Sequence, residues 1–231
     1  MTATSDLRRA AAFLDSLQQD PFEHVRLASE EHREGHAARL AGGAQECGVY
    51  PSDPLKMRVL ANIVRAMKAK RILEVGCGLG YSALCLADAA GTDGSVETID
   101  RFAEHAELAS GFAKEAGFAS RVSVLTGDSD SVLAGLSGAY DLIHDDGWFA
   151  VKPRHFGRLL ELLRPGGVLA MSNWFLLVQS MAEEPNLDWS EFAGPKWREN
   201  VQAFARDLAS ERDLEVAWMM DPGVALAVKL A

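Results

Sequence analysis

A glycine-rich loop preceded by an acid is the strongest chemical signal in the sequence. Glu74-Val-Gly76-Cys-Gly78-Leu-Gly80 follows an apolar run and leads into a helix-like segment. Glycines at such a turn let the backbone fold tightly and approach a ligand closely. A dinucleotide fingerprint would need its third glycine one position later, where Tyr81 stands. The spacing instead favours a ligand with an ammonium group, which Glu74 could receive.

Further polar residues follow the next two predicted strands. Asp100 closes one strand, at a place where an acid typically accepts both ribose hydroxyls of a nucleoside. Asp128 and Ser129 follow the next strand, where either side chain can bond an adenine edge. Because the carboxyl ends of neighbouring parallel strands meet at one edge of a sheet, these groups should converge. They predict a pocket for a nucleoside with an amino-acid tail and no phosphates, which is the shape of S-adenosylmethionine (SAM).

Several side chains around the end of the fourth predicted strand could act as a catalytic base. His144, Asp145 and Asp146 are consecutive, and His155 lies on the following helix. Histidine has a suitable unperturbed pKa, whereas adjacent strand residues such as Asp145 and Asp146 point to opposite faces. We expect Asp146 to act directly in the site. His144 fits a base or a hydrogen-bonded core histidine equally well, and His155 fits a solvated helix face better.

An alternating α/β scaffold is needed to bring these residues together. Apolar runs predict strands over 71–75, 95–99, 122–125, 140–144 and from 168, with helices over 81–90, 103–116, 129–136 and 153–163. This alternation predicts a Rossmann-like, doubly wound α/β sheet that is mostly parallel, with helices on both faces. Two alternating runs joined by Asp221-Pro-Gly223 predict a C-terminal antiparallel hairpin.

Two segments should lie outside this scaffold. Residues 1–55 are predicted to form an N-terminal helical cap, with helices over 7–19 and 22–41, followed by a SAM-binding domain over 56–231. Ser52 or Asp53 can cap a helix over 54–69. Residues 174–197 read as an inserted lid or specificity loop. Its aromatic side chains would suit a flat aromatic acceptor: Trp174, Phe175, Trp189, Phe192 and Trp197.

Composition and charge exclude several classes of protein. The 231 residues are 48% hydrophobic and 24% charged, an ordinary globular mixture with a net charge of −10. Residues 1–70 carry 10 Lys and Arg against 9 Asp and Glu, whereas residues 71–231 carry 13 against 24. The acidic balance of the larger segment disfavours nucleic acid and anionic membranes as partners.

Cysteine usage and the N-terminal sequence point to the cytoplasm. Cys47, Cys77 and Cys85 form no CxxC pair, which argues against a disulfide framework or a structural zinc site. Residues 1–17 lack the apolar core and cleavage site of a signal peptide. No run approaches the roughly 18 apolar residues of a spanning helix. We therefore expect a protein of the reducing cytoplasm.

The motifs resemble one known family, the small class I O-methyltransferases typified by catechol and caffeoyl-CoA O-methyltransferases. The resemblance covers about residues 49–229 and rests on the segments 72–82 (ILEVGCGLGYS), 140–143, 163–167 and 221–229. It implies SAM as cofactor, a small hydroxylated acceptor and a homodimer. Together, motifs and resemblance give the expected SAM contacts: Ser52, Glu74, Gly76, Cys77, Gly78, Gly80, Ser82, Asp100, Arg101, Asp128, Ser129, Asp146 and Trp148.

The metal site of this family is only partly present. Its members usually hold Mg²⁺ between an Asp after the fourth strand and an Asp-Asn pair after the fifth, and use a Lys three residues past the first Asp as base. Here the first Asp corresponds to Asp146, but the pair reads Ser172-Asn173 and the Lys position is Phe149. One carboxylate with Asn173 and the weak ligand Ser172 suits a hard divalent cation poorly.

We therefore expect a SAM-dependent O-methyltransferase of a small aromatic metabolite, with three alternatives left open. The first is a metal-independent methyltransferase acting on another nucleophile, with His144 or Asp146 as base. The second is a tRNA-modifying methyltransferase, because some relatives of this family modify tRNA wobble uridines. The third is a SAM-binding protein without catalytic activity.

Overall fold

The structure of the chain is a computed structural model. It describes residues 19–40, 49–183 and 188–230, together with Arg9, Phe13 and Leu17, and over 34–40 it describes the backbone alone. Most of the helix expected over 7–19, Cys47 and part of the expected lid therefore lie outside the described residues.

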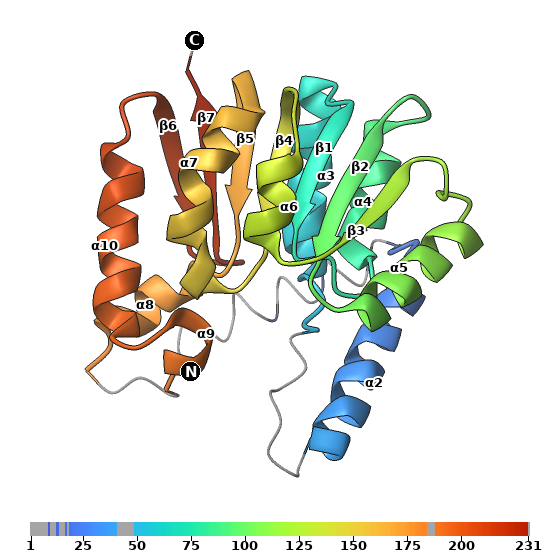
Figure 1. The fold of residues 1–231 in the computed structure, drawn as a ribbon, viewed down its shortest axis with the longest axis horizontal. Coiled ribbons are helices and arrows are strands. Elements are labelled where there is room, and N and C mark those ends of the chain that lie inside the picture. The colour runs from blue at the N-terminus through green and yellow to red at the C-terminus, as the bar shows by residue number, and fades with distance from the viewer. Residues whose placement is uncertain are drawn as a thin grey trace.

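The described elements alternate along the chain much as the sequence predicts (Figure 1). The strands are β1 (Arg71–Val75), β2 (Ser95–Asp100), β3 (Val122–Thr126), β4 (Tyr140–Asp145), β5 (Leu163–Met171), β6 (Leu214–Met219) and β7 (Val224–Lys229). The helices are α2 (Glu23–Leu40), α3 (Pro54–Met67), α4 (Tyr81–Ala90), α5 (Ala103–Glu115), α6 (Ser129–Gly135), η1 (Phe149–Val151), α7 (Lys152–Leu162), α8 (Phe175–Met181), α9 (Ser190–Ala193) and α10 (Trp197–Ser210).

The strands form one seven-stranded sheet in the order β3-β2-β1-β4-β5-β7-β6. The pairs among β3, β2, β1, β4 and β5 are parallel, whereas β7 is antiparallel to both β5 and β6. The predicted fold class, including the C-terminal hairpin, is confirmed. The chain order reverses between β1 and β4, and a cleft at the carboxyl ends of these strands is where open α/β sheets bind ligands.

Strand alternation divides the interior into two apolar cores. Ile72, Val96 and Leu142 face a core shared with α3 and α4, whereas Leu73 and Ile143 face a core shared with α7 and α10. Successive side chains of a strand point to opposite faces, so neighbouring residues of one strand enter different cores. The same rule decides which polar residues at the strand ends can meet.

Helix α3 lies against the first core with one polar residue on its buried side. Asp53 caps its first turn, and its carboxylate accepts hydrogen bonds from the backbone N–H groups of Leu55 and Lys56. The apolar stripe includes Met57, Leu60 and Val64 at helical spacing, and Lys56 shares it. A lysine on a buried helix face needs a specific partner, because burying an unpaired ammonium is costly.

One local expectation about the sheet is wrong. The fifth strand was expected to begin at 168, after a helix ending at 163, but β5 begins at Leu163 and includes 164–167. The strand accommodates the two glycines through a register shift against β4 between Tyr140 and Leu142. This irregularity lies at the amino end of β5, away from the carboxyl-end edge where the functional groups gather.

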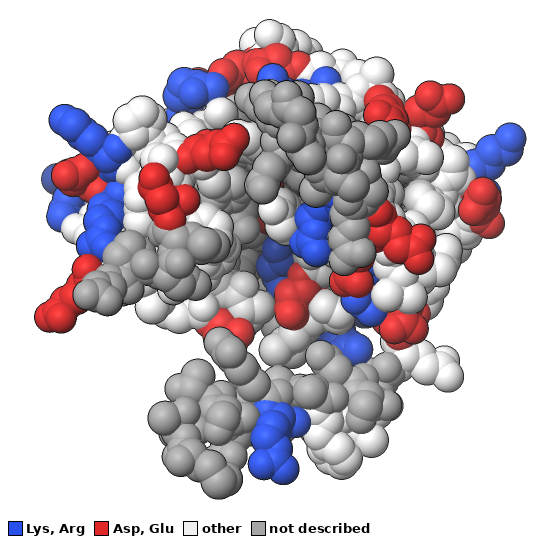
Figure 2. Space-filling model, turned by 90° about the horizontal axis from the view of Figure 1, so that it is seen from below, with Lys and Arg blue, Asp and Glu red and all other residues white. Residues whose placement is uncertain are grey.

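The carboxyl ends of the parallel strands lie at the lower edge of the sheet in Figure 1, beside α2. Seen from that side, basic and acidic side chains are interspersed over the described surface, and neither sign forms one continuous patch (Figure 2). No helix in the described ranges is both long enough and apolar enough to cross a membrane.

Candidate functional site

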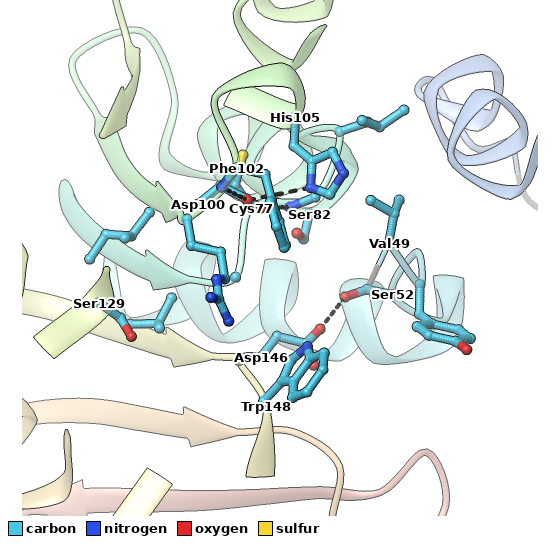
Figure 3. Close-up of a pocket in the computed structure, with 18 of the residues that line it drawn as sticks. Val49, Ser52, Cys77, Ser82, Asp100, Phe102, His105, Ser129, Asp146 and Trp148 are labelled. Atoms are coloured by element: carbon cyan, nitrogen blue, oxygen red, sulfur yellow. Dashed lines mark hydrogen bonds and ion pairs between the residues drawn. The ribbon is translucent and has the colours of Figure 1, made fainter. Parts of the chain in front are cut away.

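A pocket opens at the carboxyl ends of β1, β2 and β4, at the point where the strand order reverses. The glycine loop forms one wall, and segments after β2, β3 and β4 form the others. Ser29 of α2 and residues 49–52 before α3 close the remaining side. Figure 3 shows Asp100, Phe102 and His105 gathered at one end, while Ser52 and Asp146 point toward each other beside Trp148 at the other.

The pocket brings together most of the residues predicted to contact SAM. The predicted residues that line it are Ser52, Gly76, Cys77, Gly78, Ser82, Asp100, Arg101, Asp128, Ser129, Asp146 and Trp148. Glu74 and Gly80 are not among its lining residues. Gly80 instead supplies a left-handed residue (φ 91°) at the start of α4. Glu74 is fully buried beneath the loop, so its carboxylate does not face the pocket as the sequence suggested.

Backbone geometry explains the glycines of the loop. Gly76 has φ +96°, and a Cβ there would lie 3.0 Å from the backbone of Asp146 and Gly147. The loop after β1 can therefore pass close to the loop after β4 only without a side chain. The N–H of Gly78 donates to the Asp100 carboxylate over 2.9 Å, so the acid that ends β2 also holds the loop in place.

Several pocket residues on neighbouring elements could not be predicted from the sequence. His105 lies on the first turns of α5, 3.4 Å from the Asp100 carboxylate, and its ring packs against that of Phe102 at 5.0 Å. Ser29 and Tyr50 come from the N-terminal segment. These residues have ordinary types for a helix or loop, and only the long-range packing of α2 and α5 places them at the pocket.

Cys77 behaves as a packing residue. It is buried, and this burial, together with the charge of Glu74, raises the pKa of its thiol well above the ordinary value. The thiol therefore stays protonated and is a poor nucleophile.

A row of buried polar side chains crosses three strands below the pocket. Glu74 is in register with Thr98 of β2 and with His144 of β4. Thr98 donates to one Glu74 oxygen over 2.7 Å, and His144 Nδ1 contacts the other at 3.0 Å. A carboxylate can only accept, so Nδ1 carries the proton and Nε2 is left to accept from Ser172 Oγ at 3.0 Å. His144 is thus a fully buried, hydrogen-bonded core histidine rather than an exposed base.

Lys56 connects this row to the pocket. Its ammonium donates to Asp146 Oδ2 over 2.9 Å and to Ser172 Oγ over 3.0 Å. Ser52 donates to the same Asp146 oxygen over 2.6 Å. Sequence reasoning missed Lys56, although its place on the apolar stripe of α3 is a signal for a buried, partnered lysine. Its partner Ser172 is 116 residues away in the chain.

The surroundings of Asp146 make it a weak base. Burial raises the pKa of the Asp146 carboxyl, but the charge of Lys56 and the hydrogen bonds from Lys56 and Ser52 lower it by more. The net pKa lies well below the usual range for Asp. Such a carboxylate stays ionised and takes a proton from a hydroxyl poorly, because an efficient base needs a pKa near the working pH. Asp146 is therefore a poor candidate for the catalytic base.

The residues at the expected metal position do not fit a divalent cation. Ser172 offers a neutral hydroxyl where the resembling family has a carboxylate, and Asn173 directs its amide nitrogen to Asp146 Oδ1 at 3.2 Å. The Lys56 ammonium already lies between Asp146 and Ser172. Hard divalent cations prefer several carboxylate or carbonyl oxygens, and a neighbouring ammonium would repel them. The structure supplies one carboxylate and one positive charge instead.

Two other candidate bases lie outside the pocket. Asp145 is fully buried on the opposite face of β4 from His144, where its carboxylate pairs with Lys152 at 3.0 Å. His155 was expected on a solvated helix face but is buried, and its Nε2 lies 3.0 Å from Ser129 Oγ and 3.1 Å from Asp130. Burial lowers the pKa of His155, so a neutral ring suits its position between α6 and α7.

The aromatic residues expected in the lid divide into two groups. Trp174 and Trp197 are buried in the second core, so Trp174 does not form a wall of the acceptor site. Phe175, Trp189 and Phe192 remain partly buried and contact one another in turn. Phe192 also packs against pocket-lining Trp148, with ring centroids 6.0 Å apart. This second group continues the aromatic surface from the pocket to the described part of the lid.

Comparisons with known proteins agree with this architecture. The chain is 31% identical over 198 residues to a catechol O-methyltransferase of Mycobacterium tuberculosis, covering 77% of this chain and 84% of that protein. It is 30% identical over 180 residues to a flavonoid 3′,5′-methyltransferase of Vitis vinifera, with 74% and 75% covered. The O-methyltransferase TomG of Streptomyces achromogenes, solved with SAM, superposes with a TM-score of 0.74 at 22% identity over the full length of both chains.

A family-wide sequence profile matches a much longer part of the chain than any single motif. The sequence profile described as O-methyltransferase matches residues 52–230. That range contains α3, every strand of the sheet and all pocket-lining residues from Ser52 onward. The chain therefore belongs to the O-methyltransferase family.

Proposed function

We propose that this protein transfers the methyl group of SAM to a hydroxyl group of a small aromatic acceptor. The main support is one continuous pocket that joins the predicted nucleoside-binding loops to Asp146 and Trp148. Relatives named for catechol and flavonoid methylation support an aromatic acceptor. The chain of rings from Trp148 to Phe192 offers such an acceptor a flat apolar contact.

Each end of the pocket suits one part of SAM. Asp100 can accept the ribose hydroxyls with the oxygen lone pairs that Gly78 and Phe102 leave free. Asp128 and Ser129 lie where they can contact the adenine, and the N–H groups of the glycine loop suit the carboxylate of the methionine part. The sulfonium then lies toward Ser52 and Asp146, and Arg101 flanks the nucleoside end.

Methyl transfer from SAM is an in-line displacement. The acceptor oxygen forms a bond to the methyl carbon while the carbon–sulfur bond breaks and its electron pair stays on sulfur, giving S-adenosylhomocysteine (SAH). The acceptor proton passes to solvent water, because the described carboxylates and histidines of the site are paired or buried. The enzyme contributes mainly by holding oxygen, carbon and sulfur in line.

Asp100→Asn is expected to weaken SAH binding by about ten- to 100-fold, the range of a lost charge-assisted hydrogen bond. The substitution keeps the side-chain shape but removes the charge that serves both the loop and the ribose. Titration calorimetry with SAH measures the effect. Asp207→Asn on exposed α10 is the matched control and should bind as the parent does. Equal affinity in both variants would contradict the assignment of Asp100.

The methyl-transfer activity is tested with SAM labelled in its methyl group and a panel of phenols and catechols. Labelled ether product supports the proposal. Transfer to amines or thiols alone, or to tRNA alone, would replace the acceptor class with another nucleophile or with RNA. SAH binding without any transfer would favour a non-catalytic SAM-binding protein. The interspersed charges of the pocket face argue against RNA (Figure 2).

The organisation of the protein is proposed along the same lines. A helical cap over 1–55 precedes a SAM-binding domain over 56–231, and 174–197 acts as a lid. Packing of Phe22 and Val25 into the first core and the lining contact of Ser29 support the cap's role at the pocket. We further propose that the protein is a cytoplasmic homodimer, and light scattering of the purified protein tests the dimer.

A further inference from the structure

Lys56 is buried, but its charged end lies next to a residue of the pocket. Its side chain is 8% exposed and is not among those that line the pocket, but its ammonium lies 2.9 Å from an oxygen of Asp146, which does line it. An ammonium has three N–H donors. Two are used by Asp146 and Ser172, and the third has no partner in the described part of the chain.

The local charge supports a functional pairing of Lys56 with Ser172. A set of two carboxylates and a divalent cation is neutral. The pair formed here by the Asp146 carboxylate and the Lys56 ammonium is also neutral. The Ser172 hydroxyl removes one negative charge, and the ammonium in place of the ion removes one positive charge. These two changes in charge cancel. Lys56 and Ser172 therefore form a charge-balanced alternative to a metal centre.

We propose that the Lys56 ammonium is the built-in cation of the acceptor site and that its third N–H binds the acceptor oxygen. This inference rests on the proposed function and identifies the group that replaces the metal. The ammonium stabilises the acceptor as an oxyanion, whose proton has left to solvent water. The oxyanion then attacks the methyl carbon as the carbon–sulfur bond breaks. Ser172 and Asp146 hold the ammonium in place, and His144 and Glu74 support Ser172 from below.

A lysine also changes which acceptors the site can take. A metal ion with two open positions can bind both oxygens of a catechol, whereas one remaining N–H contacts a single oxygen. The site should therefore accept an aromatic compound with one hydroxyl group. A simple phenol whose ionisation is visible is a suitable probe, and 4-nitrophenol absorbs differently as the phenol and as the phenolate.

The test combines two binding measurements on the full-length protein saturated with SAH. The first is the spectrum of bound 4-nitrophenol at a pH where the free compound is mostly protonated. The wild type should bind it as the phenolate, and Lys56→Met should bind it about ten- to 100-fold more weakly. The second is Mn²⁺ binding by electron paramagnetic resonance, which should be absent in the wild type.

Controls separate the charge of Lys56 from its packing. Lys56→Gln keeps a hydrogen-bond donor beside Asp146 and removes only the charge, so it replaces Lys56→Met if that variant is unstable. Lys114→Met on the exposed face of α5 is the matched control. SAH affinity should be unchanged in Lys114→Met, and SAH binding that stays measurable in both Lys56 variants shows that their cofactor site is folded.

The outcomes distinguish this inference from the proposed function. Stoichiometric Mn²⁺ binding by the wild type, failure of the wild type to bind the phenolate, or equal phenolate affinity in wild type and variants would overturn the role of Lys56. None of these results would exclude methyl transfer itself. Phenolate binding that depends on Lys56, without methyl transfer to any hydroxyl compound, would instead contradict the proposed function.

Discussion

Trp174→Ala is expected to lower the free energy of unfolding by about 3–5 kcal/mol, the usual cost of truncating a buried aromatic side chain. Trp174 is fully buried, and its ring contacts those of Phe149, Phe204 and Trp218 at 5.2, 5.7 and 4.6 Å. Alanine would leave a large cavity between the end of β5 and helix α10. Urea denaturation followed by fluorescence or circular dichroism measures the change.

The same variant tests whether Trp174 packs in the core or contacts the acceptor. Because Trp174 does not line the pocket, the folded variant should bind SAH and acceptor as the parent does. Trp148→Ala is the matched control, since it removes a partly exposed indole from the pocket. It should weaken acceptor binding with little effect on stability. A Trp174→Ala protein that is fully stable but binds acceptor poorly would contradict the core assignment.

The sheet could be predicted closely from the sequence because its signals are local. Each parallel strand is a short apolar run bounded by glycine, proline or acid, and β1 and α4 have the predicted bounds. The main error is the start of β5, which was expected at 168, after Gly166 and Gly167. β5 instead pairs with β4 on both sides of these glycines, at Leu163 and Val168, a long-range effect that local residue preferences do not contain.

The cofactor loops were also predictable, because parallel strands carry their following loops to one edge. It was harder to predict the contacts of polar side chains, because these contacts depend on which face of the sheet each side chain points to. The alternation rule placed Asp145 and Asp146 on opposite sides, as the structure has them, but the motif alone aimed Glu74 at the ligand. Its register with Thr98 and His144 directs the carboxylate into a buried hydrogen-bonded row instead.

The decisive residue of the acceptor site could not be assigned from a motif. Lys56 precedes the glycine loop, and its partners Asp146 and Ser172 follow later strands. The sequence marked only the missing carboxylate at position 172. The Lys56 ammonium that compensates for this carboxylate reaches the site only because α3 packs against the face of the sheet that carries His144. The effect of losing a motif residue can therefore be judged only from the side chains that surround that position in the structure.

The double substitution Lys56→Ala and Ser172→Asp is expected to turn the site into a metal site. It removes the ammonium and restores a second carboxylate next to Asn173, whose amide can turn its oxygen toward a cation. Two carboxylates and an amide oxygen are a suitable start for a hard divalent ion, with water completing its shell. The double variant should bind Mn²⁺ with about 1:1 stoichiometry, and its methyl transfer should stop in EDTA and return with Mg²⁺.

The single variants show which change decides the result. Ser172→Asp alone keeps the ammonium, which would pair with both carboxylates and exclude the ion. Lys56→Ala alone leaves a single carboxylate, too few for tight binding. Only the double variant should hold Mn²⁺, so the two substitutions must be strongly non-additive, as expected for residues in contact. If Ser172→Asp alone bound Mn²⁺ as tightly as the double variant, Lys56 would not occupy the position of the cation.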